Sequence, residues 1–295
     1  MIRLAAPAQT NLFLEVPARR PDGFHELDTV FVALELADEL ELRPLPGGRI
    51  ELQVEGGPDV PADSTNLAWR AAEALRQVAG RPELGAALQL TKRIPAGGGL
   101  GGGSSDAAAV LRGLDRLWET GLGAARLHAL AAGLGSDVPF FLAGGLQRGR
   151  GRGERLEPLP RPPRPLDLVL VLPGFPCPTP QVYRELAPWL PGPEGPRSPA
   201  PLLAALAAGD PEAVGAELWN RLALPAFARW PRLSELERML RARPGVTGAL
   251  LSGSGSTLFA LCASTDAAAG LATALGREGL TALATRTSHP EASSD

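Results

Sequence analysis

The chain has 295 residues and a nearly balanced charge, with 29 Lys and Arg against 32 Asp and Glu, and 44% of its residues are hydrophobic. That length suits two domains of ordinary size, and the balance excludes a general nucleic-acid surface. No stretch of about 18 uninterrupted apolar residues indicates a membrane span, and the N-terminus lacks signal-peptide anatomy. Cys177 and Cys262 are too few for a disulfide framework or a zinc site. We therefore expect a cytoplasmic protein without nucleic-acid or membrane partners.

The first ninety residues predict mostly strands. Residues 11–16 form one expected strand, the alternating residues 26–42 form two, and Ile50, Leu52 and Val54 lie on another. Residues 63–66 predict a helix cap. The helix that follows has an apolar face of Leu67, Ala71, Ala72, Leu75 and Val78.

A glycine-rich segment comes next and is the most informative stretch. Six of the seven residues from Gly97 to Gly103 are glycine, and a helical apolar pattern starts at Ala107. Ser104, Ser105 and Asp106 are residue types that favour a helix N-cap. A glycine loop that enters a helix presents free backbone N–H groups and the positive end of the helix dipole. We expect a phosphate site here rather than a surface linker.

Two common phosphate loops fit this segment poorly. In the Walker pattern Ser104 would stand where the lysine must be. A dinucleotide loop should follow an apolar parallel strand directly, whereas polar residues and Pro95 precede this one. The remaining possibility is a phosphate site formed by backbone N–H groups alone, without a lysine inside the loop. Lys92, the only lysine in the chain, stands just before it.

The segment after the glycine-rich region predicts two more helices. Leu127, Leu130, Ala131 and Leu134 mark the first, which ends at Gly133 or Gly135. Pro139 suits the first turn of the second, and from residue type alone Asp137 is a helix cap. The Arg-Gly repeat of residues 148–153 resembles a charged turn.

The second half predicts an α+β domain. A buried strand is expected at residues 166–172, helices at 199–208, 211–222 and 232–242, and two strands within 248–261 that flank the loop Ser252-Gly253-Ser254-Gly255. A helix at 267–275 and a strand at 280–284 follow. We place a first domain at residues 1–155, a second at 156–287 and a disordered tail at 288–295.

Three features in order resemble the GHMP kinase superfamily. They are the segment Pro7 to Leu12 with Arg20-Pro21-Asp22-Gly23-Phe24-His25-Glu26-Leu27, the loop Pro95 to Ser105, and the loop Ser252 to Gly255. The segments Gly135 to Phe141 and Pro178-Thr179-Pro180 further match one branch of the superfamily. The resemblance implies a two-domain α+β fold. Its N-terminal domain would be a mixed α/β domain of the ribosomal protein S5 domain 2-like type, and its C-terminal domain ferredoxin-like.

The resemblance is greatest to the branch that phosphorylates the 2-hydroxyl of 4-diphosphocytidyl-2-C-methyl-D-erythritol in the non-mevalonate isoprenoid pathway. It implies an ATP-dependent kinase that uses ATP and Mg²⁺. An aspartate matching Asp137 would take the proton of the acceptor hydroxyl, which replaces the helix-cap interpretation of that residue. The implied ATP-binding residues are Asn66, Leu67, Lys92, Pro95, Ala96, Gly97, Gly98, Gly99, Leu100, Gly101, Gly102, Gly103, Ser104 and Ser105. The implied substrate-binding residues are Asn11, Phe24, His25, Thr179 and Tyr183, of which Phe24 and Tyr183 match aromatic positions that flank the cytosine.

One position departs from the family pattern Pro-Ala-Lys-x-Asn, because Gln9 stands where the lysine is expected. Three hypotheses follow. Asp137 works alone while Gln9 orients the hydroxyl, which we prefer; an arginine such as Arg20 supplies the charge; or the chain is a nucleotide-binding relative with impaired catalysis. Another small-alcohol kinase of the superfamily, of homoserine or mevalonate type, is the alternative activity.

Overall fold

The computed structural model describes residues 1–57, 59–190 and 195–288, which fold into two compact units. The first unit comprises residues 1–9, 36–96 and 101–144, and the second comprises residues 10–35, 97–100 and the chain from 145 onward. Two long strands, β1 (Ile2–Arg19) and β2 (His25–Leu45), contribute residues to both units. The glycine-rich segment also contributes to both.

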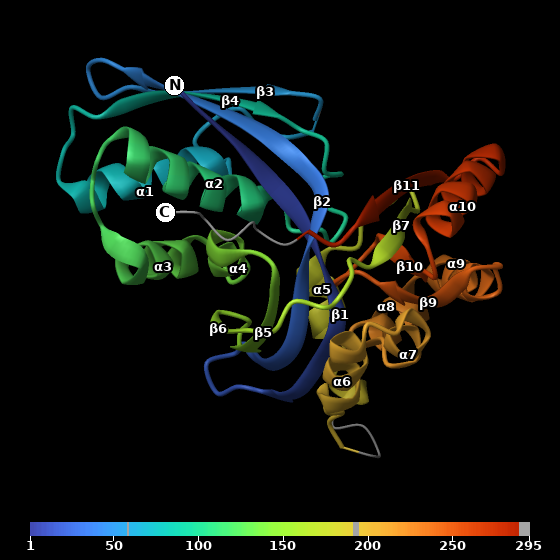
Figure 1. The fold of residues 1–295 in the computed structure, drawn as a ribbon. Coiled ribbons are helices and arrows are strands. Elements are labelled where there is room, and N and C mark those ends of the chain that lie inside the picture. The colour runs from blue at the N-terminus through green and yellow to red at the C-terminus, as the bar shows by residue number, and fades with distance from the viewer. Residues whose placement is uncertain (58, 191–194, 289–295) are drawn as a thin grey trace. The chain divides into compact units, whose positions relative to one another are not determined.

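The first unit pairs three strands and packs helices against them. β4 (Gly85–Thr91) lies antiparallel to the second half of β2, with Glu39 opposite Thr91, and parallel to β3 (Ile50–Glu55). Figure 1 shows α1 and α2 side by side beneath these strands. The helices of this unit are α1 (Leu67–Ala79), α2 (Gly102–Leu117), α3 (Gly123–Leu134) and α4 (Val138–Ala143).

Small residues let α2 pack closely. Ala107, Ala108 and Ala109 are fully buried, and Gly113 faces the strands. A Cβ on Gly113 would stand 2.3 Å from Cδ1 of Leu42, so a larger residue would force the Leu42 side chain or the helix to move. The sequence of α2 thus fixes the depth at which the helix, and the loop before it, lie against the sheet.

The second unit contains two groups of paired strands. The first half of β2 pairs with β5 (Leu146–Gly151), β5 with β6 (Arg155–Pro158), and β1 in parallel with β8 (Trp219–Asn220). A separate antiparallel sheet has the order β11-β7-β10-β9, built from β7 (Asp167–Leu172), β9 (Val246–Leu251), β10 (Leu258–Cys262) and β11 (Thr281–Arg286). The helices are α5 (Thr179–Arg184), α6 (Ala200–Ala208), α7 (Pro211–Ala216), α8 (Ala223–Arg229), α9 (Pro231–Arg241) and α10 (Thr265–Arg277), with a 3₁₀ turn, η1 (Ala187–Trp189).

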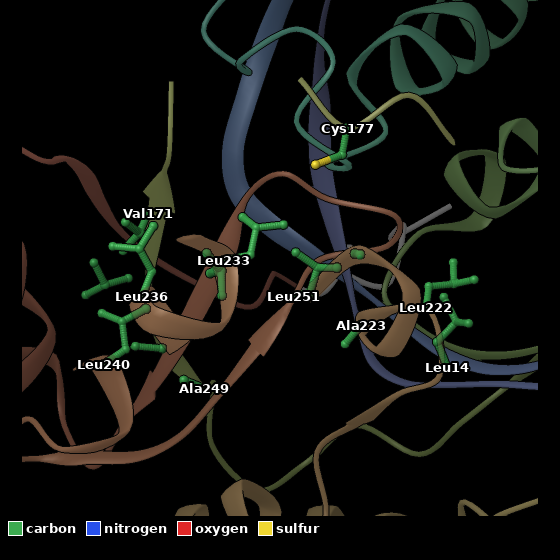
Figure 2. Close-up of a cluster of buried hydrophobic side chains, with 14 of the residues drawn as sticks. Leu14, Val171, Cys177, Leu222, Ala223, Leu233, Leu236, Leu240, Ala249 and Leu251 are labelled. Atoms are coloured by element: carbon green, nitrogen blue, oxygen red, sulfur yellow. The ribbon is translucent and has the colours of Figure 1, made fainter. Parts of the chain in front are cut away.

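The core of this second unit forms between the sheet and its helices. Leu233, Leu236 and Leu240 recur at helical spacing on α9 and are buried. Figure 2 shows these leucines gathered near Val171 of β7. The same cluster includes Leu251, at the end of β9 next to the Ser252–Gly255 loop, so the core holds the strand from which that loop begins.

Several predicted elements differ from the observed ones. Residues 26–42 lie in one strand, β2, rather than two. The Arg-Gly segment is a turn only at its end, because residues 148–151 belong to β5 and residues 152–153 lie in the turn that leads to β6. A Cβ on Gly149 would stand 2.6 Å from the Phe31 ring, so this glycine serves strand packing. The helix predicted over 211–222 ends at Ala216, where β8 soon follows.

Other expectations are confirmed, and some stay untested. The Asn66 side chain caps α1 by accepting the N–H of Ala68 at 2.8 Å. The strands at 166–172 and within 248–261 are β7, β9 and β10. The boundary near residue 155 stays a prediction. So does the disordered tail, of which residues 289–295 lie outside the described part. Within the described residues, no helix combines the length and apolar character that a membrane span requires.

Candidate functional site

The start of α2 is built for close approach of the chain. Its N-cap is Gly101, in a left-handed conformation with φ of 71°. A Cβ there would stand 2.7 Å from the Phe141 ring and 2.9 Å from Cγ of Gln9, so glycine is required both for the backbone angle and for the space. The predicted cap residues 104–106 instead lie inside the helix, so that prediction was wrong.

The first turn of α2 offers unpaired donors. No side chain caps this 16-residue helix, so the N–H groups of its first turn have no side-chain partner. The Ser105 hydroxyl is buried and has no hydrogen-bond partner within the described residues. A long helix that begins with uncapped N–H groups, after a glycine-rich segment, has the features that favour anion binding.

A buried charge cluster lies directly behind this helix start. The Lys92 ammonium contacts the Asp38 carboxylate and donates to Oδ2 of Asp106 at 2.7 Å. All three side chains are at least 92% buried. Oδ1 of Asp38 also accepts the backbone N–H groups of Arg93 at 2.5 Å and Ile94 at 2.8 Å. Burial raises the pKa of Asp106 to about 7, against the opposing effect of the Lys92 charge.

Lys92 and its neighbours also border the residues predicted to hold the ATP base. Its methylene stem lies against Gly57, where a Cβ would stand 3.0 Å from Cγ of Lys92. Leu67 begins α1, and its Cδ1 lies 3.8 Å from where a Cβ on Gly103 would stand. The ammonium is paired with two carboxylates and the side chain is almost fully buried.

Gln9 and Asp137 are the predicted catalytic pair of the first unit. Gln9 is 3% exposed, and its Oε1 has no hydrogen-bond partner within the described part of the chain. Asp137 occupies the N-cap position of α4, as its residue type suggested, but its side chain makes no capping hydrogen bond. Burial raises the pKa of Asp137, although its side chain keeps partial solvent contact. A carboxylate with a raised pKa is a stronger proton acceptor once ionised.

The second unit holds the first half of the glycine-rich segment. Ser252 Oγ donates to the carbonyl of Gly99 at 3.0 Å, and the Thr257 N–H donates to the carbonyl of Gly98 at 3.2 Å. Thr10 Oγ donates to Ser252 Oγ at 2.9 Å. The Asn220 amide in turn holds the Ser-Gly loop, because it donates to the carbonyls of Leu251 at 2.8 Å and Gly253 at 2.7 Å.

The residues predicted to bind the substrate all lie in this second unit, and several are close together. The rings of His25 and Tyr183 have centroids 5.0 Å apart. The Thr179 and Ser254 hydroxyls are 2.6 Å apart. Burial and, to a smaller degree, the Arg19 charge lower the pKa of His25, so its imidazole is neutral at physiological pH.

Phe24 and Asn11 complete the predicted substrate set. Phe24 is half exposed, with the Arg152 guanidinium 4.8 Å from its ring centre. The Asn11 amide is buried and donates to Thr29 Oγ1 at 2.8 Å. The paired rings of His25 and Tyr183, the first a neutral imidazole, and the exposed ring of Phe24 together suit a flat, hydrogen-bonding base.

Two residues in and around the site, Asp38 and Thr10, were not identified from the sequence. Asp38 sits in an alternating strand pattern and carries no motif, so only the fold shows that it faces Lys92. Thr10 was not identified either, although its position between Gln9 and Asn11 in a motif could have indicated it. Arg20, proposed as a substitute charge, is ion-paired with Asp22 and Glu26.

Two family models match this chain. The family model "GHMP kinases N terminal domain" matches residues 66–145, and "GHMP kinases C terminal" matches residues 202–280. The chain belongs to the GHMP kinases. The predicted resemblance and the two-domain α+β fold class are thereby confirmed.

Individual GHMP kinases resemble the chain over nearly its whole length. A 4-diphosphocytidyl-2-C-methyl-D-erythritol kinase of Pelotomaculum thermopropionicum is 44% identical, over 98% of this chain and 99% of that protein. The enzyme of the same name from Thermus thermophilus is 46% identical, over 92% and 91% respectively. A crystal structure of a 4-(cytidine 5'-diphospho)-2C-methyl-D-erythritol kinase superposes with a TM-score of 0.82 at 43% identity, over 97% of this chain and 99% of that one.

More distant GHMP kinases share the fold alone. L. major mevalonate kinase superposes with a TM-score of 0.75 but is 18% identical, over 99% of this chain and 97% of that one. At that identity the similarity carries no information on the acceptor alcohol.

Proposed function

We propose that this GHMP kinase transfers the γ-phosphoryl group of ATP to the 2-hydroxyl of 4-diphosphocytidyl-2-C-methyl-D-erythritol. The observation that carries the proposal is the identity of 44–46% over nearly the full length to relatives of that name. The ring pair of His25 and Tyr183 with exposed Phe24 supports it, because a cytosine needs flat contact surfaces and hydrogen-bond partners. A homoserine or mevalonate acceptor would use neither.

The reaction assigns a distinct task to each part of the site. The acceptor oxygen attacks the γ-phosphorus, its proton passes to Asp137, and the bond from the γ-phosphorus to the ADP oxygen breaks. The uncapped N–H groups at the start of α2, with those of the glycine-rich segment, offset the charge of the transferring phosphoryl group. A base placed at the hydroxyl contributes about 10²–10⁴-fold in rate.

Mg²⁺ is the expected companion of ATP. Within the described residues, no three His, Cys, Asp or Glu side chains are grouped to hold a metal ion. In kinases Mg²⁺ is usually bound by nucleotide phosphates and water together with one or two carboxylates. When bound, the ion neutralises phosphate charge. A cytoplasmic location likewise stays a prediction.

Gln9 has a positioning role in this proposal. Its side chain is buried, with a free Oε1 that can accept the hydrogen bond of a hydroxyl. It carries no charge, so it cannot lower the acceptor pKa as a lysine would. We therefore expect an active enzyme whose chemical step depends on Asp137 and is slower than that of a lysine-containing relative.

The test is a panel of acceptor alcohols with purified protein. ADP release is measured with the cytidyl substrate, homoserine and mevalonate, in wild type and in Asp137→Asn. We expect turnover with the cytidyl substrate alone and a loss of about 10²–10⁴-fold in kcat in the variant. Turnover with another acceptor would favour the alternative kinase. ATP binding without any turnover would support the hypothesis of a nucleotide-binding relative with impaired catalysis. An undiminished kcat in Asp137→Asn would refute the assignment of Asp137 as the base.

A further inference from the structure

The Asp38, Lys92 and Asp106 cluster is not used by any step above, yet it touches both flanks of the glycine-rich segment. Lys92 lies two residues before Ile94, where the first flank ends, and Asp106 lies in the helix that forms the second flank. All of these residues belong to the first unit, so the cluster is described within one compact body.

Asp38 holds the first flank by three contacts. One carboxylate oxygen accepts the N–H groups of Arg93 at 2.5 Å and Ile94 at 2.8 Å, and the other contacts the Lys92 ammonium. β4 ends at Thr91, so these two N–H groups have left the ladder of strand hydrogen bonds. A fully buried aspartate on β2 therefore replaces the sheet as their partner.

The second flank is held by the same ammonium. Lys92 Nζ donates to Asp106 at 2.7 Å and lies 3.4 Å from where a Cβ on Gly102 would stand. Cγ2 of Ile94 lies 3.1 Å from the same point. The last residues before the glycine-rich segment and the first residues of α2 are thus fixed against each other.

Fixed ends matter for a segment of this composition. Glycine loses more conformational freedom on ordering than any other residue, and that loss has to be met when the segment wraps a ligand. Holding both flanks in place before the ligand arrives lowers the cost of binding. A surface ion pair could not do this, since exposed pairs are weak and mobile.

We propose that Asp38 and Asp106, acting through Lys92, are positioning residues that hold the two flanks of the glycine-rich segment in the form that binds the phosphates of ATP. Asp38 contributes most, because it also binds the two backbone N–H groups. The proposal rests on the proposed function only for the identity of the ligand. It predicts a specific loss of ATP affinity, while the acceptor alcohol binds as before.

The test compares Asp38→Asn and Asp106→Asn with Glu39→Gln, the adjacent side chain, which is exposed and pairs with Arg93 at 2.7 Å. Binding of ATP and of the cytidyl substrate is measured separately by calorimetry. Hydrogen exchange of the ligand-free protein is followed in peptides covering residues 92–104, with residues 246–262 as reference. We expect Asp38→Asn to weaken ATP binding about 10-fold and Asp106→Asn about 3-fold, one hydrogen bond to a charged group being the scale.

Exchange at residues 92–104 should quicken in both variants, with the reference peptide and Glu39→Gln unchanged. ATP affinity and exchange equal to wild type in both folded variants would overturn the proposal. So would an equal loss of affinity for ATP and acceptor, which indicates general destabilisation. Should Asp38→Asn not fold, Asp106→Asn decides alone. Because exchange needs no ligand, its outcome stands apart from failure of the proposed reaction.

Discussion

Ser252 Oγ donates a hydrogen bond to the carbonyl oxygen of Gly99 at 3.0 Å, joining two glycine-rich loops that are 153 residues apart. Thr10 donates to the same hydroxyl at 2.9 Å. The hydroxyl of Ser252 therefore connects β1 with the first half of the glycine-rich segment. The same hydroxyl gives the Gly99 carbonyl a hydrogen-bond partner, which limits the orientations that this carbonyl can adopt.

Removing this hydroxyl tests the connection. In Ser252→Ala the Gly99 carbonyl loses its partner, and we expect the KM for ATP to rise about 5- to 10-fold with kcat changed less than 3-fold, since one buried hydrogen bond contributes about 1 kcal/mol. Thr10→Val should have a smaller effect of the same kind. Steady-state kinetics with varied ATP measure both. Ser234→Ala, at a partly exposed serine on α9, is the control and should behave as wild type. A fall in kcat alone would point to a different role.

Substitution of Gln9 tests whether the missing lysine charge limits the rate of phosphoryl transfer. Replacing it by lysine restores the charge that the family pattern has at this point, next to Gly101 and Phe141. We expect Gln9→Lys to raise kcat about 10- to 100-fold, within the range known for a single electrostatic donor. Gln9→Met fills the same space without polar atoms and should lower kcat about 10-fold. Single-turnover rates of the phosphoryl step measure this directly. A lysine variant no faster than wild type would show that the active site has adapted to glutamine.

The motifs in the sequence were enough to predict the fold class, because patterns in register specify a family even where single helices are misplaced. Composition could not reveal why residues 148–151 form a strand. Their Arg-Gly pattern suits a turn, and the close approach of the Phe31 ring to Gly149 explains that glycine. The length of β2 could not be predicted either. No local feature of the sequence marks where a strand ends when its two halves pair with different strands, here β4 and β5.

The candidate site was predicted unevenly for a related reason. Asn66 was recognised because capping is a local property, visible over a few residues. Ser104, Ser105 and Asp106 were assigned as caps by the same logic, and that failed because Gly101 already begins the helix. Asp38 was not predicted at all. It meets Lys92 across 54 residues of chain, and such pairing depends on strand register, which residue types alone do not fix.

A buried ion pair makes a separate prediction about stability. Glu15, fully buried on β1, binds the Arg221 guanidinium at 2.7 and 3.0 Å. Burial would raise the pKa of Glu15, but hydrogen bonds from Arg221, the Arg197 N–H and the Val16 N–H outweigh it and hold the pKa below its usual value. We expect Glu15→Gln to lower the free energy of unfolding at pH 7 by about 3–5 kcal/mol, since it leaves Arg221 buried without a counter-charge.

The pH dependence follows from the direction of that shift. A carboxyl with a lowered folded pKa stabilises the fold above its ordinary value of 4.5, and the contribution is lost as the pH falls through the folded pKa. The difference between wild type and Glu15→Gln in urea unfolding should therefore shrink below pH 4. The exposed pair Arg232 and Glu235 gives the control, with Glu235→Gln costing less than about 1 kcal/mol. A constant difference from pH 7 to pH 3 would contradict this assignment.

Asp137 should show the opposite dependence, because its pKa is raised by burial rather than lowered by partners. An acid whose folded pKa is raised favours the fold while protonated, so its contribution is complete below the ordinary value of 3.8 and is lost as the pH rises through the folded pKa. Above the folded pKa the ionised carboxylate thus destabilises the protein that needs it for catalysis. Asp137→Asn, which cannot ionise, should melt about 2–4 °C above wild type at pH 8. It should match wild type below pH 4, while kcat falls by the factor given above.

Scanning fluorimetry across this range, with the exposed Asp59→Asn as control, separates the two effects. Lower stability of Asp137→Asn at pH 8 would mean that the carboxylate has a stabilising partner, and the assignment of Asp137 as a base with a raised pKa would have to be abandoned.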